Sequence, residues 1–228
     1  MTTRAPDPAQ RLGDAHRPLR EQVADELRSR IVDGRLEPGA RLIETQLAEQ
    51  LGVSRNPIRE ALRVLEAEGF VLTQPRRGLL VASLDEAAIN DLFDVRRTLE
   101  EYASARAAER VAAGEVSVDR LRAVLDKARR ATDAGDFAAI SALNSDFHTE
   151  IVRLAGNALL HDMVRPMQWR VRWVFQLSAE LRAPRSLSEH EQLCDAIARG
   201  EATVAGRIGG AHAERARTAA LDAVRGDD

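Results

Sequence analysis

Apolar residues recur every four positions near the start of the chain. They fall at Leu19, Val23, Leu27 and Ile31. One turn of an α-helix takes about 3.6 residues, so this spacing places all of them in one stripe along a helix. Pro18 is suited to the first position of such a helix, and a glycine follows at position 34. The pattern therefore predicts an amphipathic helix over residues 18–33.

Two shorter helices are expected next. A turn at residues 35–39 contains both proline and glycine. Thr45 can cap a helix over 46–51, because a threonine hydroxyl can accept a hydrogen bond from a free backbone N–H of the first turn. Ser54 can cap the following helix, over 55–68, in the same way. That third helix has a periodic apolar face and an arginine-rich opposite face.

A β-hairpin is predicted after the third helix. Two short apolar strings, residues 70–73 and 79–81, are joined by a segment that holds a proline, two arginines and a glycine, residues 74–78. A further extended piece is expected at residues 41–43. Three helices followed by a two-stranded hairpin form a winged helix-turn-helix.

Long alanine-rich amphipathic helices dominate the chain after Ser83. The fold class predicted is therefore mainly α: a winged helix-turn-helix domain over residues 18–83, followed by an all-α antiparallel bundle of about six helices over residues 84–228. We expect these helices at residues 85–113, 117–134, 136–154, 157–181, 188–199 and 201–225, with turns at Gly114, Gly135, Gly156, Pro184 and Gly200.

The composition of the 228-residue chain suits two domains of ordinary size. Apolar residues make up 44% and charged residues 30%, and no stretch approaches the roughly 18 apolar residues that a membrane helix needs. Residues 1–17 are polar, contain two prolines and lack the apolar core of a secretory signal. We interpret them as a disordered tail of a cytoplasmic protein. A single cysteine, Cys194, excludes a disulfide framework and a zinc site made of several thiolates.

The net charge of −3 does not suit a protein that only binds nucleic acid, because such proteins are usually basic. The charge is unevenly distributed, however. The part up to Ser83 carries 13 arginines and 12 acidic residues, whereas acidic residues are in excess in the rest of the chain. This asymmetry is small, but it has the sign expected of a DNA-binding N-terminal domain.

The third predicted helix has the features of a DNA-recognition helix. Arg55 and Arg59 lie one turn apart on its polar face, and Ser54 can donate its hydroxyl to a phosphate near the helix N-terminus. An isolated pair of arginines at this spacing more often belongs to a solvated surface. With the contacts expected from the preceding helix and from the hairpin tip, the candidate DNA-binding residues are Thr45, Ser54, Arg55, Asn56, Arg59, Arg76 and Arg77.

The segment Leu47–Leu62, LAEQLGVSRNPIREAL, strengthens this interpretation. It resembles the corresponding segment of the GntR family of transcription regulators almost position for position, and the resemblance extends over residues 18–81. It implies that the protein binds operator DNA as a homodimer, with Arg55 and Arg59 contacting bases and the hairpin in the minor groove. Because a single winged module makes few base contacts, we expect paired half-sites and therefore a palindromic operator.

Three of the five histidines, His148, His190 and His212, fall on three different predicted helices. Asn144 precedes His148 by four residues, so both side chains project from one helical face, as two ligands of one metal must. Asp146 is a better ligand by chemistry, but it lies about 200° around the helix from Asn144. From residue type alone, three separated histidines are more often unrelated residues of core and surface.

The second half of the chain resembles the FCD domain of the FadR subfamily, through residues 92–100, 144–157 and 189–193 and His212. The resemblance implies a divalent metal held by an aspartate and three histidines, and a carboxylate effector bound with the help of that metal. The metal ligands would here be Asn144, His148, His190 and His212. Arg96 matches an arginine whose guanidinium could hold the effector's carboxylate. An ion pair between Arg96 and a neighbouring helix is an equally good explanation of that residue.

Asn144 departs from the family pattern, which has aspartate at this position. A neutral amide oxygen can coordinate a cation, but it brings no negative charge, so we expect it to weaken the retention of a divalent metal. Three imidazoles and one oxygen suit zinc, nickel or manganese, and the sequence leaves the choice between them open.

These observations favour a transcription regulator, not an enzyme, whose operator affinity responds to a small effector bound among the C-terminal helices. One alternative is a regulator for which the metal itself is the signal. Another is a metal-dependent hydrolase with a DNA-binding appendage, which would need a general base near the metal. Asp146 and Glu150 are the nearest carboxylates on the same predicted helix, but neither has the spacing that places it at the metal.

Overall fold

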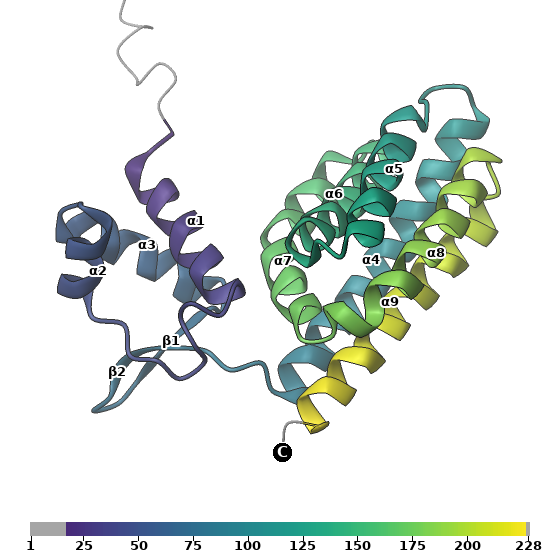
Figure 1. The fold of residues 1–228 in the computed structure, drawn as a ribbon. Helices are drawn as coiled ribbons and strands as arrows, with labels where there is room; N and C mark the ends of the chain where they lie inside the picture. Colours follow the sequence, from purple (N-terminus) through teal and green to yellow (C-terminus); the bar gives the residue numbers. More distant parts are fainter. Residues whose placement is uncertain (1–16, 227–228) are drawn as a thin grey trace, which may run out of the picture. The chain divides into compact units, whose positions relative to one another are not determined.

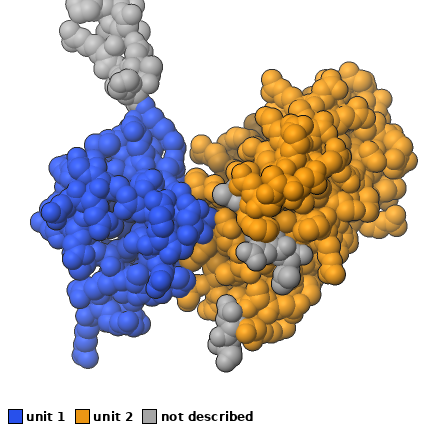
Figure 2. All heavy atoms as spheres, viewed as in Figure 1, with its two compact units in different colours: residues 1–82 blue, residues 83–228 orange. Residues whose placement is uncertain are grey.

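The computed structural model describes residues 17–226, except for the side chains of residues 138 and 179–181. The chain divides into two compact units, residues 1–82 and residues 83–228 (Figure 2). Nearly all of the predicted disordered tail, residues 1–17, lies outside the described residues. Among the helices that are described, none is long and apolar enough to cross a membrane.

The described part of the first unit, residues 17–82, contains three helices and a two-stranded sheet, as predicted for a winged helix-turn-helix (Figure 1). Leu27 and Ile31 from the first helix and Ile58 and Leu65 from the third are at most 1% exposed, so the apolar stripes predicted from the sequence form the core. The elements are α1 (Leu19–Val32), α2 (Glu44–Leu51), α3 (Arg55–Ala67), β1 (Val71–Gln74) and β2 (Gly78–Val81).

The sheet is an antiparallel hairpin in which Val71 pairs with Val81 and Gln74 pairs with Gly78. Gly78 has a φ of +83°, a conformation that glycine adopts at little cost at the end of a tight turn. Arg76 at the tip also has a positive φ, 68°. This hairpin is the wing, and it presents the arginines of its tip to solvent.

The predicted capping role of Thr45 is wrong. Helix α2 begins at Glu44, two residues earlier than expected, so Ile43 occupies the cap position and Thr45 lies exposed in the first turn. An acidic side chain in the first turn is favourable because the N-terminus of a helix carries a partial positive charge. Ser54 does occupy the cap position of α3, but its side chain makes no capping hydrogen bond there.

The second unit is a bundle of α-helices in which α4 and α9 lie side by side over much of their length (Figure 1). The prediction of about six helices is confirmed for the described part of the chain. They are α4 (Glu86–Ala112), α5 (Asp119–Ala134), α6 (Phe137–Ala155), α7 (Ala158–Gln176), α8 (Ala179–Ala198) and α9 (Ala202–Gly226).

The turn predicted at Pro184 is wrong. The chain turns at Leu177 and Ser178 instead, and Pro184 lies inside α8. Because α8 begins at Ala179, the proline falls in its second turn, where the ring removes one backbone hydrogen bond without stopping the helix. Helix α8 is therefore longer than predicted and α7 shorter, and His190 lies in the middle of α8.

Two glycines allow α4 and α9 to approach closely. A Cβ atom on Gly209 would lie 2.6 Å from Ser104 Oγ and 3.1 Å from the backbone oxygen of Glu100, and one on Gly206 would lie 3.2 Å from the backbone oxygen of Glu101. Helix α9 can therefore pack directly on the backbone of α4. This contact fixes the distance between the polar residues of α4 and those of α9.

Candidate DNA interface and candidate metal centre

Helix α3 has one buried face and one exposed face. Ile58 and Leu62 pack into the core at 0% and 2% exposure. On the other face, the side chains of Arg55 and Arg59 are 60% and 48% exposed. The N-terminal half of this helix therefore presents two long, multiply donating side chains to solvent, as contact with base edges requires.

Glu44 holds these two arginines together, and the sequence analysis missed it. Its carboxylate accepts hydrogen bonds from Arg59 Nε and Nη2 at 3.1 Å and 2.9 Å and from Arg55 Nη2 at 3.3 Å. The hydrogen bond from Arg59 is the main reason that the pKa of Glu44 is lowered. Glu44 lies on α2, 11 and 15 residues before its partners, so no helical periodicity could have revealed the contact.

The other candidate DNA-binding residues are also exposed, and two of them make local hydrogen bonds. Asn56 Nδ2 donates to Glu60 Oε1 at 3.0 Å, and Arg77 Nη1 donates to Gln74 Oε1 at 3.2 Å. Both bonds join residues three or four positions apart, the first within α3 and the second within the wing. The exposed set as a whole is Thr45, Ser54, Arg55, Asn56, Arg59, Arg76 and Arg77, and its contact with DNA stays a prediction.

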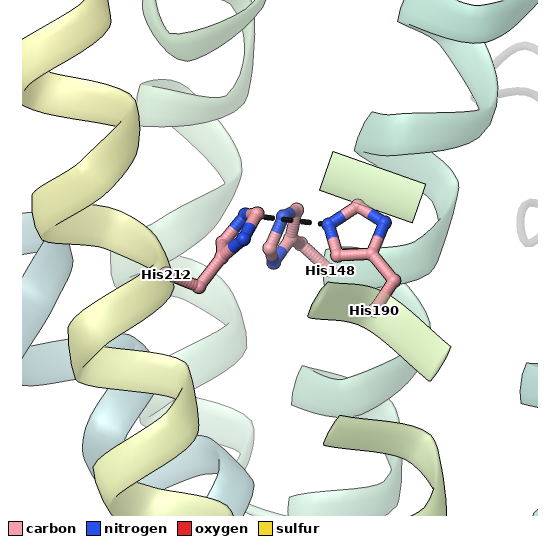
Figure 3. A group of neighbouring side chains, drawn as sticks. All are labelled: His148, His190 and His212. Atoms are coloured by element: carbon pink, nitrogen blue, oxygen red, sulfur yellow. Dashed lines mark hydrogen bonds between the residues drawn. The ribbon is translucent and has the colours of Figure 1, made fainter. Parts of the chain in front are cut away.

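The three histidines meet inside the second unit. His148 comes from α6, His190 from α8 and His212 from α9, and their rings converge (Figure 3). One ring nitrogen of each lies within 4.8 Å of the others, and the Nε2 atoms of His190 and His212 are 3.3 Å apart. His190 and His212 are 4% and 2% exposed, and the His148 side chain is 12% exposed. Three buried imidazoles in this arrangement could hold a metal ion.

Burial keeps the three imidazoles neutral at pH 7. Desolvation lowers the pKa of His148 to about 4, and the nearby Arg96 guanidinium lowers it further while Glu100 opposes this. The pKa values of His190 and His212 lie well below the usual value, mainly because both rings are buried and also because they lie close to other potential cations. A neutral imidazole has the free lone pair that metal coordination requires.

Two carboxylates orient the histidine rings, and the sequence analysis missed both. Glu189 Oε2 lies 2.7 Å from His212 Nδ1, and Glu100 Oε1 lies 3.3 Å from His148 Nδ1. Burial opposes the ionisation of Glu189, but hydrogen bonds from Arg182 and Arg215 outweigh it, so its pKa is lowered. Glu189 accepts from His212 Nδ1–H, and Glu100 faces His148 Nδ1, so Nε2 is left as the acceptor of each ring, an arrangement typical of metal-binding histidines.

Arg96 is only 5% exposed and contacts the same cluster. Its Nε donates to Glu100 Oε1 at 2.6 Å, and its Nη2 lies 3.2 Å from His148 Nε2. The ion pair considered for Arg96 is therefore formed, but with the next turn of α4 itself, not with a neighbouring helix. The four-residue spacing from Arg96 to Glu100 is a signal in the sequence that could have revealed it.

Asn144 lies beside the histidines and is 6% exposed. With Arg96, Glu100 and His148 it lines a mostly apolar cavity against α4 and α7, and it also lines a second cavity together with His190. Its Oδ1 atom is buried and accepts no hydrogen bond from the described residues. An unpartnered buried amide oxygen next to three neutral imidazoles fits the donor set of a divalent metal.

The remaining side chains considered for a metal or a general base lie elsewhere. Asp146 is exposed, and Glu150 forms an ion pair with Arg153 at 2.6 Å. Cys194 is buried, and burial raises the pKa of its thiol to about 11, so it stays protonated. The arrangement therefore favours binding over hydrolytic chemistry.

Two family models match the chain. The model described as bacterial regulatory proteins, gntR family, matches residues 19–81, and the model of the FCD domain matches residues 91–215. The first match covers the helices and wing of the first unit. The second covers the helices that carry Arg96 and the three histidines.

Curated relatives and a solved structure are similar over most of the chain. The Nta operon transcriptional regulator of Aminobacter aminovorans is 33% identical over 69% of this chain and 75% of its own length. The gluconate operon transcriptional repressor of Bacillus licheniformis is 31% identical over 76% of this chain and 70% of its own length. The crystal structure of a putative transcriptional regulator GntR from Rhodococcus sp. RHA1 matches with a TM-score of 0.74 and 26% identity, covering 89% of this chain and 97% of that one.

Proposed function

This chain belongs to the GntR family of bacterial transcription regulators and carries an FCD domain, and we propose that a small carboxylate bound in that domain controls its affinity for operator DNA. The families and relatives are DNA-binding regulators, not enzymes. We propose that the protein acts in the cytoplasm, where bacterial DNA lies. One relative represses a gluconate operon, and gluconate is a small carboxylate.

The observation that carries this proposal is the contact of Arg96 with a cluster of three neutral histidines, one of which, His148, lines the same cavity of the helical unit as Arg96. An apolar cavity with a few convergent polar groups is the usual form of a small-molecule site. A guanidinium and a histidine-bound cation are both suited to a carboxylate, the first through paired N–H donors and the second through its charge. Effector binding can then shift the protein between two dimer arrangements that differ in operator affinity.

A divalent metal would be held by His148, His190 and His212, with Asn144 Oδ1 as the oxygen ligand. When bound, such an ion supplies a positive charge and an open coordination position for a carboxylate oxygen. Zinc and nickel suit a nitrogen-rich site best, and manganese remains the third candidate. The amide of Asn144 brings no negative charge, so we expect weaker retention than an aspartate would give.

Replacing His190 or His148 with alanine is expected to remove the metal. Elemental analysis of the purified wild type should find about one zinc, nickel or manganese ion per chain, and each variant should contain much less, because two imidazoles and an amide hold a divalent ion poorly. His161→Ala is the matched control, since His161 lies outside the cluster with its side chain 49% exposed. Equal metal contents in all four proteins would contradict the assignment.

The same preparations distinguish a metal-responsive regulator from an effector-responsive one. If the metal itself is the signal, a chelator should change operator affinity in the absence of any organic ligand. If the metal serves only to bind the effector, chelation should abolish the response to a carboxylate and leave basal operator affinity unchanged.

An exposed apolar surface supports the proposed homodimer. On α4, Val95 and Tyr102 are 49% and 48% exposed, and on α7, Leu159 and Met163 are 69% and 50% exposed. Tyr102 is linked to the start of α7 by a hydrogen bond from Asn157 Nδ2 at 3.3 Å, and it lines one surface hollow together with Leu159. Exposed apolar patches of this kind commonly mark protein interfaces.

Selection of bound fragments from a pool of random double-stranded DNA tests the function as a whole. We expect a palindromic consensus whose half-sites lie about one helical turn apart, because each protomer of a dimer contacts one half-site. Light scattering of the full-length protein at micromolar concentration should give twice the 25.1 kDa mass of the chain. A monomer in solution, or a selected pool without any consensus, would refute the proposal.

A further inference from the structure

A positively charged side chain of the protein itself, that of Arg96, already contacts the histidine cluster. Arg96 Nη2 lies 3.2 Å from His148 Nε2. A guanidinium has only hydrogen-bond donors, so His148 Nε2 must accept, and the proton of the neutral ring must be on Nδ1, which faces Glu100 Oε1 at 3.3 Å. The Nε2 lone pair of His148 is therefore used by Arg96.

A metal bound through this nitrogen would need the same lone pair. His212 is held in the matching tautomer, because the ionised Glu189 accepts from its Nδ1 at 2.7 Å. Its Nε2 is then an acceptor that faces His190 Nε2 across 3.3 Å (Figure 3). Two rings are thus oriented for Nε2 coordination, and Arg96 blocks one of them.

Arg96 and a divalent cation exclude each other at this position. One lone pair can bind one partner, and like charges a few ångströms apart in a buried site repel strongly. Arg96 is held in place by its bond to Glu100, at 2.6 Å, on the same helix. The other oxygen of Glu100, Oε2, is buried and accepts no hydrogen bond from the described residues. If the guanidinium left, the carboxyl group of Glu100 would still face His148 Nδ1, whereas Asn144 supplies only an amide.

We propose that Arg96 and a divalent metal compete for His148 Nε2, so that metal binding releases the Arg96 guanidinium to the cavity, where it can bind an anionic effector. Arg96, Glu100 and His148 all line that cavity, so the side chain can reach it without a rearrangement of the helices. This inference rests on the proposed function and adds an order to it: metal first, then effector. Thermodynamic linkage then requires that an anion bound to Arg96 also strengthens metal binding.

Zinc titration of full-length protein without any effector tests the competition. Competition with a chromophoric chelator should show that Arg96→Met binds Zn²⁺ at least tenfold more tightly than the wild type, because the competing cation is gone. Arg97→Met is the matched control, since Arg97 is the next residue on α4 and its side chain is 47% exposed. This control should bind Zn²⁺ like the wild type.

A second measurement on the wild type does not depend on how the variant folds. The ¹⁵Nε–H resonance of Arg96, assigned with Arg96→Lys, should shift in proportion to bound Zn²⁺ as the guanidinium leaves Glu100 and His148. The competition would be overturned if zinc bound while this resonance stayed unchanged. It would also be overturned if a folded Arg96→Met variant bound zinc with the same affinity as the wild type. In either case the metal site itself would stand. No zinc binding in either protein would overturn both the competition and the proposed metal site.

Discussion

Replacing Arg59 with alanine should weaken binding to the selected operator by roughly 10- to 100-fold and leave the fold unchanged. Arg59 is one turn into α3, its side chain is 48% exposed, and it donates two hydrogen bonds to Glu44. A guanidinium fork in this position can make two hydrogen bonds to one base, and alanine makes none. We would measure binding isotherms on operator DNA and on random DNA at several salt concentrations. Circular dichroism of the variant would check that its fold is unchanged.

The control for this variant is Arg207→Ala, which removes the same charge from an exposed position on α9. It should leave operator affinity close to that of the wild type. A base contact by Arg59 predicts a loss on the operator that exceeds the loss on random DNA. The two losses could instead be equal, with the slope of log affinity against log salt concentration reduced by about one. In that case Arg59 contacts only phosphate, and the recognition-helix assignment needs revision.

Replacing Gly209 with alanine should destabilise the helical unit by about 1 to 3 kcal/mol, as is usual when a methyl group is forced into a filled space. The new Cβ would lie 2.6 Å from Ser104 Oγ and 3.1 Å from the backbone oxygen of Glu100. Ser104 is 1% exposed, so it has little room to move. The clash should separate α9 from α4, lower the denaturation midpoint and also weaken zinc binding, because His212 lies one turn further along α9.

Gly210→Ala is the matched control for Gly209→Ala. The nearest atom to its new Cβ is Glu101 Oε2 at 3.3 Å, at the end of a flexible side chain. Alanine is a better helix former than glycine by about 1 kcal/mol, so this variant should be as stable as the wild type or slightly more stable. Equal denaturation midpoints for the two variants would show that α4 and α9 leave more space at Gly209 than the structure indicates.

The elements of the first unit could be predicted from the sequence because they depend on local patterns. The four-residue apolar spacing of α1 and the alternation of apolar strings with a proline–glycine turn each involve neighbouring residues. The errors concern the boundaries of helices, predicted at Thr45 and Pro184. Helix α2 begins at Glu44 after Ile43, which has no capping side chain, and α8 begins at Ala179 after Ser178, whose side chain makes no capping hydrogen bond.

The polar contacts at the two candidate sites required the tertiary structure. Glu44 contacts Arg59 across 15 residues, and Glu189 contacts His212 across 23. Periodicity indicates which face of a helix is polar, but it does not indicate which other helix that face meets or how closely. Here the distance is set by packing, above all by the glycines that bring α9 onto α4.

By itself, the sequence determined the class of fold, the position of the recognition helix and the residue types available for a metal. Only the tertiary structure decided that His148, His190 and His212 share one buried space, that Glu189 and Glu100 face the Nδ1 atoms of two of them, and that Arg96 already occupies a lone pair there. The physical reason is the range of the forces involved. Helix formation depends on neighbours within a few residues, whereas a binding site depends on the packing of side chains that lie far apart along the chain.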